Sequence, residues 1–302
     1  MASPLAKKLE KALGCGIKGS RPMHGGDIAD VSLLTLQNGA RVVAKRPRAD
    51  QPDTTDTEAL MLQHLKAHSS LPVPDILFHA PGILVLSHIP HAGPQDVALA
   101  SKSVAINVAQ LHACVAESVS GFGRSAAKGV TKPYGFKHDT YIGPLVQQNA
   151  VSASWVSFFR DRRLLAMAGS CQRTDKLSSS DYARVEKLAL KLGDLIPDTP
   201  PASLLHGDLW AGNMLIDGDH AAGFIDPAIS YGHNEMDLAF IDLMGGLDPV
   251  FFDAYNEHRP IEPGFHEERK SIYQLWPLLV HVRLFGGGYV AQVSRILEQF
   301  DC

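Results

Sequence analysis

Short apolar runs separated by turn dipeptides fill the first third of the chain. Asn38-Gly39 and Pro81-Gly82 each interrupt a pair of such runs, and Asn-Gly between apolar segments is a strong signal for a β-hairpin. The pattern predicts a small sheet with strands at residues 31–36, 41–45, 76–79 and 83–86. Leucines at helical spacing predict helices beside it, over residues 3–13 and 54–67.

From residue 95 onward the apolar spacing becomes mainly helical. Helices are expected over residues 95–119, 181–192, 236–244, 251–257, 271–284 and 289–300. The segment from Ser87 to Pro90 leaves the last predicted strand, so we place the boundary between two lobes there, with residues 1–88 in one lobe and 89–302 in the other. The expected fold class is α+β, with a small β-rich lobe, a larger helical lobe and the default ligand site in the cleft between them.

Composition and charge argue against several classes of protein. The 302 residues are 45% hydrophobic and 20% charged, an ordinary balance for a globular protein with room for two lobes. The formal net charge is −4 and no run of lysines or arginines occurs, which disfavours nucleic acid or an anionic membrane as the main partner. No apolar stretch approaches the ~18 residues of a membrane span. The start of the chain lacks the apolar core of a signal peptide, and the four scattered cysteines indicate reduced thiols, so we expect a cytoplasmic protein.

The chemistry concentrates in residues 204–226. Asp208 precedes Asn213 by five positions, an apolar strand starts directly after Asn213, and Asp226 closes the next strand. Asp217-Gly218-Asp219 reads as a hairpin turn that would bring Asn213 and Asp226 close together. Although His-Gly-Asp alone is most often a turn with a solvated acid, two carboxylates and an amide that converge can hold Mg²⁺ and orient a hydroxyl, as phosphoryl transfer from ATP requires.

The small lobe contains a second candidate pair. Lys45 ends a predicted strand, and Glu58 lies in the first turn of the next helix, where an acid also suits the helix dipole. A strand lysine followed by a helix glutamate is how a kinase builds the ion pair that holds the ATP phosphates, and the Asp208 region favours that interpretation.

Two further segments are candidates for contact with ATP. A turn at Gly25-Gly26 could let backbone N–H groups approach a phosphate, although a plain turn is the simpler interpretation. In a kinase-like plan, the adenine edge would meet the backbone of Ser87, His88 and Ile89.

Taken together, these motifs resemble those of the fructosamine kinase family, also called ketosamine 3-kinases. That family shares a bilobal protein-kinase-like fold with aminoglycoside phosphotransferases and choline kinases. Residues 206–213 resemble the family's HGDLWxGN, residues 226–239 its DPA…YGHxExDLA, and residues 147–164 its QxN…W…FF…RL. The similarity extends to a C-terminal helix around residues 273–281, so it covers nearly the whole chain.

The resemblance implies a kinase that uses ATP and Mg²⁺ to phosphorylate a ketoamine on the hydroxyl of the third sugar carbon. It implies that Asp208 accepts or orients the hydroxyl proton, that Asn213 and Asp226 hold Mg²⁺, and that Lys45, paired with Glu58, contacts the phosphates. Trp210 and Trp155 are candidates for stacking on the sugar or for a place in the core. His233, Glu235 and Asp237 are candidates for bracing the catalytic loop or for contact with substrate, and bracing is favoured for Asp237 because it opens a helix.

Two positions depart from the family pattern. Val151 stands where a tryptophan is frequent, and Asp27 stands where eukaryotic members often have a cysteine. The Asp27 side chain should point away from ATP phosphates or contact a cation, because an acid would repel them.

Alternative functions stay open at this point. The nearest is another small-molecule phosphotransferase, acting on an aminoglycoside or choline. A metal-dependent phosphohydrolase using His206, Asp208, Asp226 and His233 leaves the Lys45–Glu58 pair unexplained, and a non-catalytic kinase-like binding module would ordinarily have lost one of the key residues. The preferred sugar, the choice between small-molecule and protein-linked ketoamines, and the oligomeric state do not follow from the sequence.

Overall fold

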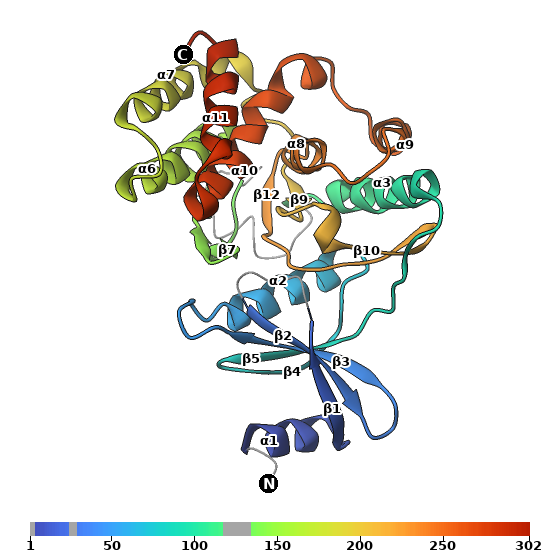
Figure 1. Cartoon of the computed structure of the whole chain (residues 1–302). Helices are drawn as coiled ribbons and strands as arrows, with labels where there is room; N and C mark the ends of the chain where they lie inside the picture. Colours follow the sequence, from blue (N-terminus) through green and yellow to red (C-terminus); the bar gives the residue numbers. More distant parts are fainter. Residues whose placement is uncertain (1–3, 24–28, 117–133) are drawn as a thin grey trace.

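The computed structural model describes residues 4–23, 29–116 and 134–302. Its N-terminal part is a five-stranded antiparallel sheet (Figure 1). The strand order is β1-β2-β3-β5-β4, with bounds Ile17–Pro22, Ala29–Leu36, Arg41–Pro47, Ile83–Ser87 and Ile76–Ala80 in that order. The predicted strands are confirmed, and β1 is additional. It was missed because this edge strand is mostly polar and exposed, so it has no apolar run to reveal it.

Helices pack on both faces of this sheet. Helix α1 (Pro4–Leu13) contributes Leu9 to an apolar cluster that includes Val42, Ala44 and Val85. Helix α2 (Thr55–His68) packs Ala59 and Leu62 against Leu84 and Leu86. Successive residues of β5 therefore face opposite clusters, as the two-residue period of a strand requires.

The larger lobe is mainly helical and contains the main hydrophobic core (Figure 1). Its long helices confirm the expected ones: α3 (Val97–Ala113), α7 (Ser179–Leu195), α8 (Glu235–Met244), α9 (Val250–His258), α10 (Lys270–Phe285) and α11 (Gly288–Gln299). The predicted end of the first of these, at residues 117–119, lies outside the described residues. Further elements are α5 (Trp155–Phe158), η2 (Phe159–Leu164), α6 (Leu165–Arg173) and η4 (Phe265–Arg269).

Short strands in this lobe position the candidate catalytic segment. Strand β9 (Ser203–Leu205) pairs with β12 (Ser230–Gly232), and β10 (Met214–Gly218) pairs with β11 (His220–Phe224). A third pair joins β7 (Thr140–Ile142) to β8 (Leu145–Gln147). The β9–β12 pair was not predicted, because three-residue strands leave no readable period.

The connection between the lobes follows β5. After Ser87 the chain passes to β6 (Gly93–Pro94), which pairs in parallel with β10. The division after residue 88 stays a prediction. No helix within the described ranges is long and apolar enough to cross a membrane.

Candidate active site

The β10–β11 hairpin forms as predicted and brings the candidate metal ligands to one end. Asn213 ends a short 3₁₀ turn (Ala211–Asn213, η3) directly before β10, and its carbonyl accepts the backbone N–H of Ile225 at 3.0 Å. The side-chain Nδ2 of Asn213 donates to both the backbone oxygen and Oδ2 of Asp208, each at 2.9 Å. Asp208 and Asn213 therefore form one rigid unit at the hairpin base.

Asp226 follows β11 in an unusual backbone conformation. Its φ is +55°, in the left-handed region that few residues other than glycine adopt, and aspartate tolerates it better than most. Its carboxylate contacts the Lys45 ammonium, and the side chain keeps 41% of its surface exposed. The strained turn thus directs an acid out of the core and toward the small lobe.

Lys45 also forms the predicted ion pair with Glu58. Its Nζ donates to Oε1 of Glu58 at 2.6 Å, and only 9% of the Lys45 side chain is exposed. Burial alone would lower the pKa of Lys45, but the charges of Asp226 and Glu58 outweigh it and hold that pKa above its ordinary value. Lys45 therefore stays cationic and joins β3, α2 and the hairpin at one point.

Asp208 is half-buried in the loop after β9. Burial, followed by the charge of Asp226, raises the pKa of Asp208 to about 7, although the Asn213 hydrogen bond opposes the shift. A cation bound to Asp226 would lower that pKa by offsetting the neighbouring carboxylate.

The donor set fits a hard divalent cation. Both N–H groups of the Asn213 amide point at Asp208, which leaves its carbonyl oxygen for a metal. Asp226 adds an exposed carboxylate, and oxygen ligands of this kind suit Mg²⁺.

Asp237 braces the catalytic loop from behind. It is 1% exposed, and its two carboxylate oxygens accept the backbone N–H groups of His206 at 2.8 Å and Gly207 at 2.9 Å. The ring of His112 lies 3.1 Å away and reaches Tyr255 on its other side at 2.8 Å. The bracing role favoured for Asp237 agrees with these contacts.

Replacing Asp237 by asparagine should loosen this loop. An amide can accept one of the two N–H groups but not both, so one buried donor loses its partner at a cost of about 1–3 kcal/mol of stability. We expect a lower unfolding midpoint and kcat/KM reduced about 10- to 10²-fold through misplacement of Asp208. The matched control is Asp242→Asn on the same helix, where the carboxylate bonds Lys270 and Gln274 instead. Equal kcat/KM losses in both variants would contradict a specific bracing role.

Gly207 allows a close backbone approach at this loop. Its φ is +83°, and a Cβ at this position would lie 2.1 Å from the carbonyl oxygen of Ala228. Ala228 in turn donates its N–H to the His206 carbonyl at 2.7 Å. The loop before Asp208 is therefore held between the segment that precedes β12 and helix α8.

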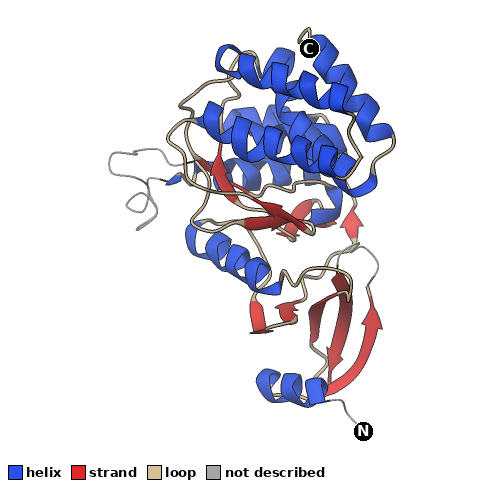
Figure 2. Cartoon of the chain, turned by 90° about the vertical axis from the view of Figure 1, so that its left-hand side faces the viewer, coloured by secondary structure: helices blue, strands red, loops and turns tan. Residues whose placement is uncertain are grey.

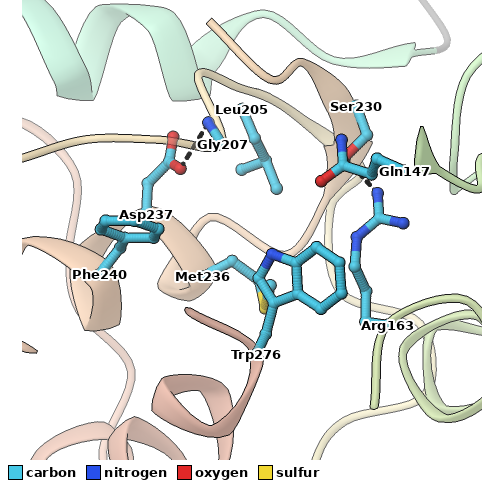
Figure 3. Close-up of a pocket in the computed structure, with 9 residues that line it drawn as sticks. All are labelled: Gln147, Arg163, Leu205, Gly207, Ser230, Met236, Asp237, Phe240 and Trp276. Carbon is cyan, nitrogen blue, oxygen red and sulfur yellow. Dashed lines mark hydrogen bonds between the residues drawn. The ribbon is translucent and has the colours of Figure 1, made fainter. Parts of the chain in front are cut away.

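A small cavity lies behind Gly207 (Figure 3). Its volume is ≈ 10 Å³, enough for about one water molecule and too small for a sugar. The residues around it are Gln147, Arg163, Leu205, Gly207, Ser230, Met236, Asp237, Phe240 and Trp276. This cavity lies within the packing that supports the loop before Asp208.

Sequence reasoning did not assign the polar network on the cavity wall. Arg163 is 2% exposed and donates to Asn149 Oδ1 at 2.8 Å and Ser230 Oγ at 3.0 Å. Gln147 donates to the Ala228 carbonyl at 2.8 Å. The QxN…RL motif was recognised, but only the fold shows that its polar members hold β12.

Three of the four candidate substrate residues are buried in the large lobe. Trp155 is 1% exposed, stacks on Phe158, and donates Nε1 to the Tyr273 hydroxyl at 2.9 Å, so the core alternative is the one found. His233 is 4% exposed and its Nδ1 also meets the Tyr273 hydroxyl. Glu235, 1% exposed, is held by Arg269 through bonds of 2.6 and 2.7 Å. In all three cases the contacts are those of the structural alternative, support within the large lobe, and contact with substrate stays a prediction.

Trp210 is the remaining aromatic candidate. It is 38% exposed, and its indole lies against Gly212, where a Cβ would come within 2.3 Å of the ring. It stays available for stacking on a ligand.

The structure describes only some of the other residues predicted to lie near ATP. Gly25, Gly26 and Asp27 lie outside the described residues. Ser87 ends β5, and His88 and Ile89 lead to the large lobe, with Ile89 packed against Gly223 of the hairpin. Their contact with adenine stays a prediction.

The fold and site define a protein-kinase-like phosphotransferase. A solved "putative fructosamine-3-kinase" from Thermobifida fusca superposes with a TM-score of 0.83 at 28% identity, covering 99% of this chain and 100% of that one. An aminoglycoside phosphotransferase, solved as a ternary complex with AMP-PNP and hygromycin B, has a TM-score of 0.68 at 14% identity and 99% coverage of both chains. The second likeness concerns the fold alone.

Sequence comparison identifies the family. The family model described as fructosamine kinase matches residues 1–301, so the chain belongs to the fructosamine kinase family of ATP-dependent phosphotransferases. The mouse "Ketosamine-3-kinase" is 31% identical over 97% of this chain and 98% of its own length. A "Probable ketoamine kinase" of Enterococcus faecium is 41% identical over 170 residues, 55% of this chain and 60% of that protein. The resemblance inferred from the motifs is confirmed.

Proposed function

We propose that the protein is a Mg²⁺-dependent ATP kinase that phosphorylates a hydroxyl of a ketoamine. One observation carries the proposal: Glu58, Lys45 and Asp226 are joined side chain to side chain, and Asp208 is bonded to Asn213, whose carbonyl accepts the N–H of Ile225 next to Asp226. A non-catalytic module has no need to keep these two sets of polar groups beside each other.

Asp208 would act on the acceptor. Its carboxylate, fixed through Asn213, would receive a hydrogen bond from the attacking hydroxyl and orient the oxygen toward the terminal phosphorus of ATP. Most of the acceleration would come from positioning the two reactants.

Lys45 would act on the nucleotide. The ammonium would neutralise phosphate charge, and Glu58 would hold it in place on the small-lobe side. Asn213 and Asp226 would hold Mg²⁺, which supplies charge neutralisation between the phosphates when bound.

The acceptor assignment draws on the named relatives. Mouse ketosamine-3-kinase and the Arabidopsis "Protein-ribulosamine 3-kinase, chloroplastic" carry names that specify a ketosamine or ribulosamine and its third position. The indole of Trp210, two residues after Asp208, is half-exposed and would stack on the sugar ring. We therefore propose the 3-hydroxyl of a fructosamine or ribulosamine as the acceptor.

The site of phosphorylation tests this proposal. Fructosyl-lysine would be incubated with the protein, ATP and Mg²⁺, and the product examined by two-dimensional ¹H–³¹P NMR. The expected spectrum couples phosphorus to the proton on the third sugar carbon. Phosphorus coupled to another sugar carbon would contradict the regiochemistry, and unchanged fructosyl-lysine and ribulosyl-lysine would contradict the acceptor class.

A further inference from the structure

Helix α2 contacts both lobes of the molecule. Ala59 and Leu62 pack against the five-stranded sheet, whereas Met61 and Leu65 belong to the core cluster of the large lobe. Two views at right angles place α2 between the sheet and the helical lobe (Figures 1 and 2). Because α2 also carries Glu58, its position determines where the partner of Lys45 lies.

His64 makes a polar contact between α2 and the large lobe. Its Nε2 lies 2.9 Å from the hydroxyl of Tyr231, and its ring meets Phe136 edge-on at 4.8 Å between centroids. Tyr231 is fully buried in β12. The bond therefore ties the helix that carries Glu58 to a strand of the catalytic lobe.

Tyr231 is well fixed and lies close to the catalytic loop in the sheet. It pairs with Leu204 of β9, four residues before Asp208, and exchanges two backbone hydrogen bonds of 2.8 Å with Gly135. A strand held on both sides cannot follow a shift of α2, so the hydroxyl is a fixed anchor.

The His64–Tyr231 bond joins two neutral groups at neutral pH. Burial, with the nearby His68 and Lys137, lowers the pKa of His64 to about 4, and burial raises the pKa of Tyr231. Neither group changes charge near pH 7. Loss of the bond would leave a half-buried ring nitrogen without this partner, which favours the paired position of α2.

We propose that the hydrogen bond between His64 and Tyr231 holds α2 against the large lobe and thereby keeps Glu58 in place to pair with Lys45. His64 and Tyr231 are positioning residues: they act on the nucleotide through Glu58. His64 lies six residues beyond Glu58, about 9 Å along the helix axis at 1.5 Å per residue. The bond thus couples the small-lobe half of the site to the strand pair that presents Asp208.

The variant Tyr231→Phe removes only the hydroxyl. The readout is the Kd of Mg·ATP, measured by calorimetry without any acceptor, together with KM for ATP and kcat. We expect the Kd and the KM for ATP to rise about fivefold, the scale of one neutral hydrogen bond, with a smaller change in kcat. His64→Phe, which keeps a ring against Phe136, should give the same rise.

A matched control separates positioning from loss of stability. Tyr134 is equally buried and donates its hydroxyl to the Pro200 carbonyl at 2.6 Å, so Tyr134→Phe removes a tyrosine hydroxyl without removing the His64 bond. We expect it to lower the unfolding midpoint and leave the Kd of Mg·ATP unchanged.

A double-mutant cycle with Glu58→Gln tests whether Tyr231→Phe changes the Kd of Mg·ATP through Glu58. If α2 acts through Glu58, Tyr231→Phe should change the Kd of Mg·ATP little once Glu58 is replaced. Additive effects in the cycle, or an unchanged Kd in folded Tyr231→Phe, would overturn the inference.

The inference rests on one part of the proposed function, the binding of Mg·ATP, and does not depend on the ketoamine acceptor. A wild-type protein that binds ATP but phosphorylates no ketoamine would contradict only the proposed acceptor, and one that binds no ATP would contradict both proposals.

Discussion

Replacing Asp208 by asparagine is expected to lower kcat about 10²- to 10⁴-fold, the usual scale for a positioned acid–base group. The substitution keeps the shape of the side chain and removes its capacity to take a proton. Asn213 donates its amide to Asp208 and could still donate to the new amide oxygen, so the loop should keep its conformation. Steady-state kinetics with a ketoamine and ATP measure the effect.

The control for this variant is intact nucleotide binding. Asp208→Asn should unfold near the wild-type temperature and bind Mg·ATP with similar affinity, because Lys45 and Glu58 are unchanged. Turnover within about threefold of wild type, in a folded protein, would remove Asp208 from the mechanism.

Replacing Asp226 by alanine is expected to lower kcat/KM about 10²- to 10³-fold and to raise the Mg²⁺ concentration needed for activity. Two causes combine here. The proposed site loses its only carboxylate ligand, and the buried Lys45 loses one of its two acidic partners. Initial rates over a range of Mg²⁺ concentrations separate the metal effect from the loss in rate.

Asp219 provides a matched control on the same hairpin. It lies exposed in the turn between β10 and β11, so Asp219→Ala removes a carboxylate without touching Lys45 or Asn213. Asp219→Ala should follow the wild-type Mg²⁺ curve. An unchanged Mg²⁺ curve for Asp226→Ala would show that the ligand assignment is wrong.

The residue pattern predicted those arrangements that depend on residues close together along the chain. The hairpin after Asn213 follows from a turn between two apolar runs, and the Lys45–Glu58 pair from a strand followed by a helix. Both arrangements involve short separations along the chain, so the residue pattern alone contains the information.

Arrangements that depend on distant packing could not be predicted. Nothing near Trp155 in the sequence shows that Tyr273 fills the space beside it and takes its N–H. In the same way, the buried position of Glu235 depends on Arg269, 34 residues further along the chain. Residues that look chemically active in a motif can therefore serve as support for the loop that carries the chemistry.

The β12 strand illustrates the same limit. Three residues have no period to detect, yet the strand carries Ser230 to Arg163 and Tyr231 to His64, and it lies beside the strand that leads to Asp208. Its importance appears only when the contacts from three separate segments are seen together.

The most direct test of the account is Mg²⁺-dependent ADP release from ATP with fructosyl-lysine, ribulosyl-lysine, kanamycin and choline as acceptors, with Asp208→Asn as the blank. The account predicts turnover with at least one sugar-lysine adduct, none with kanamycin or choline, and loss of that turnover in the blank. Turnover confined to kanamycin or choline would contradict the ketoamine assignment, and equal ADP release by wild type and Asp208→Asn would contradict the assigned mechanism.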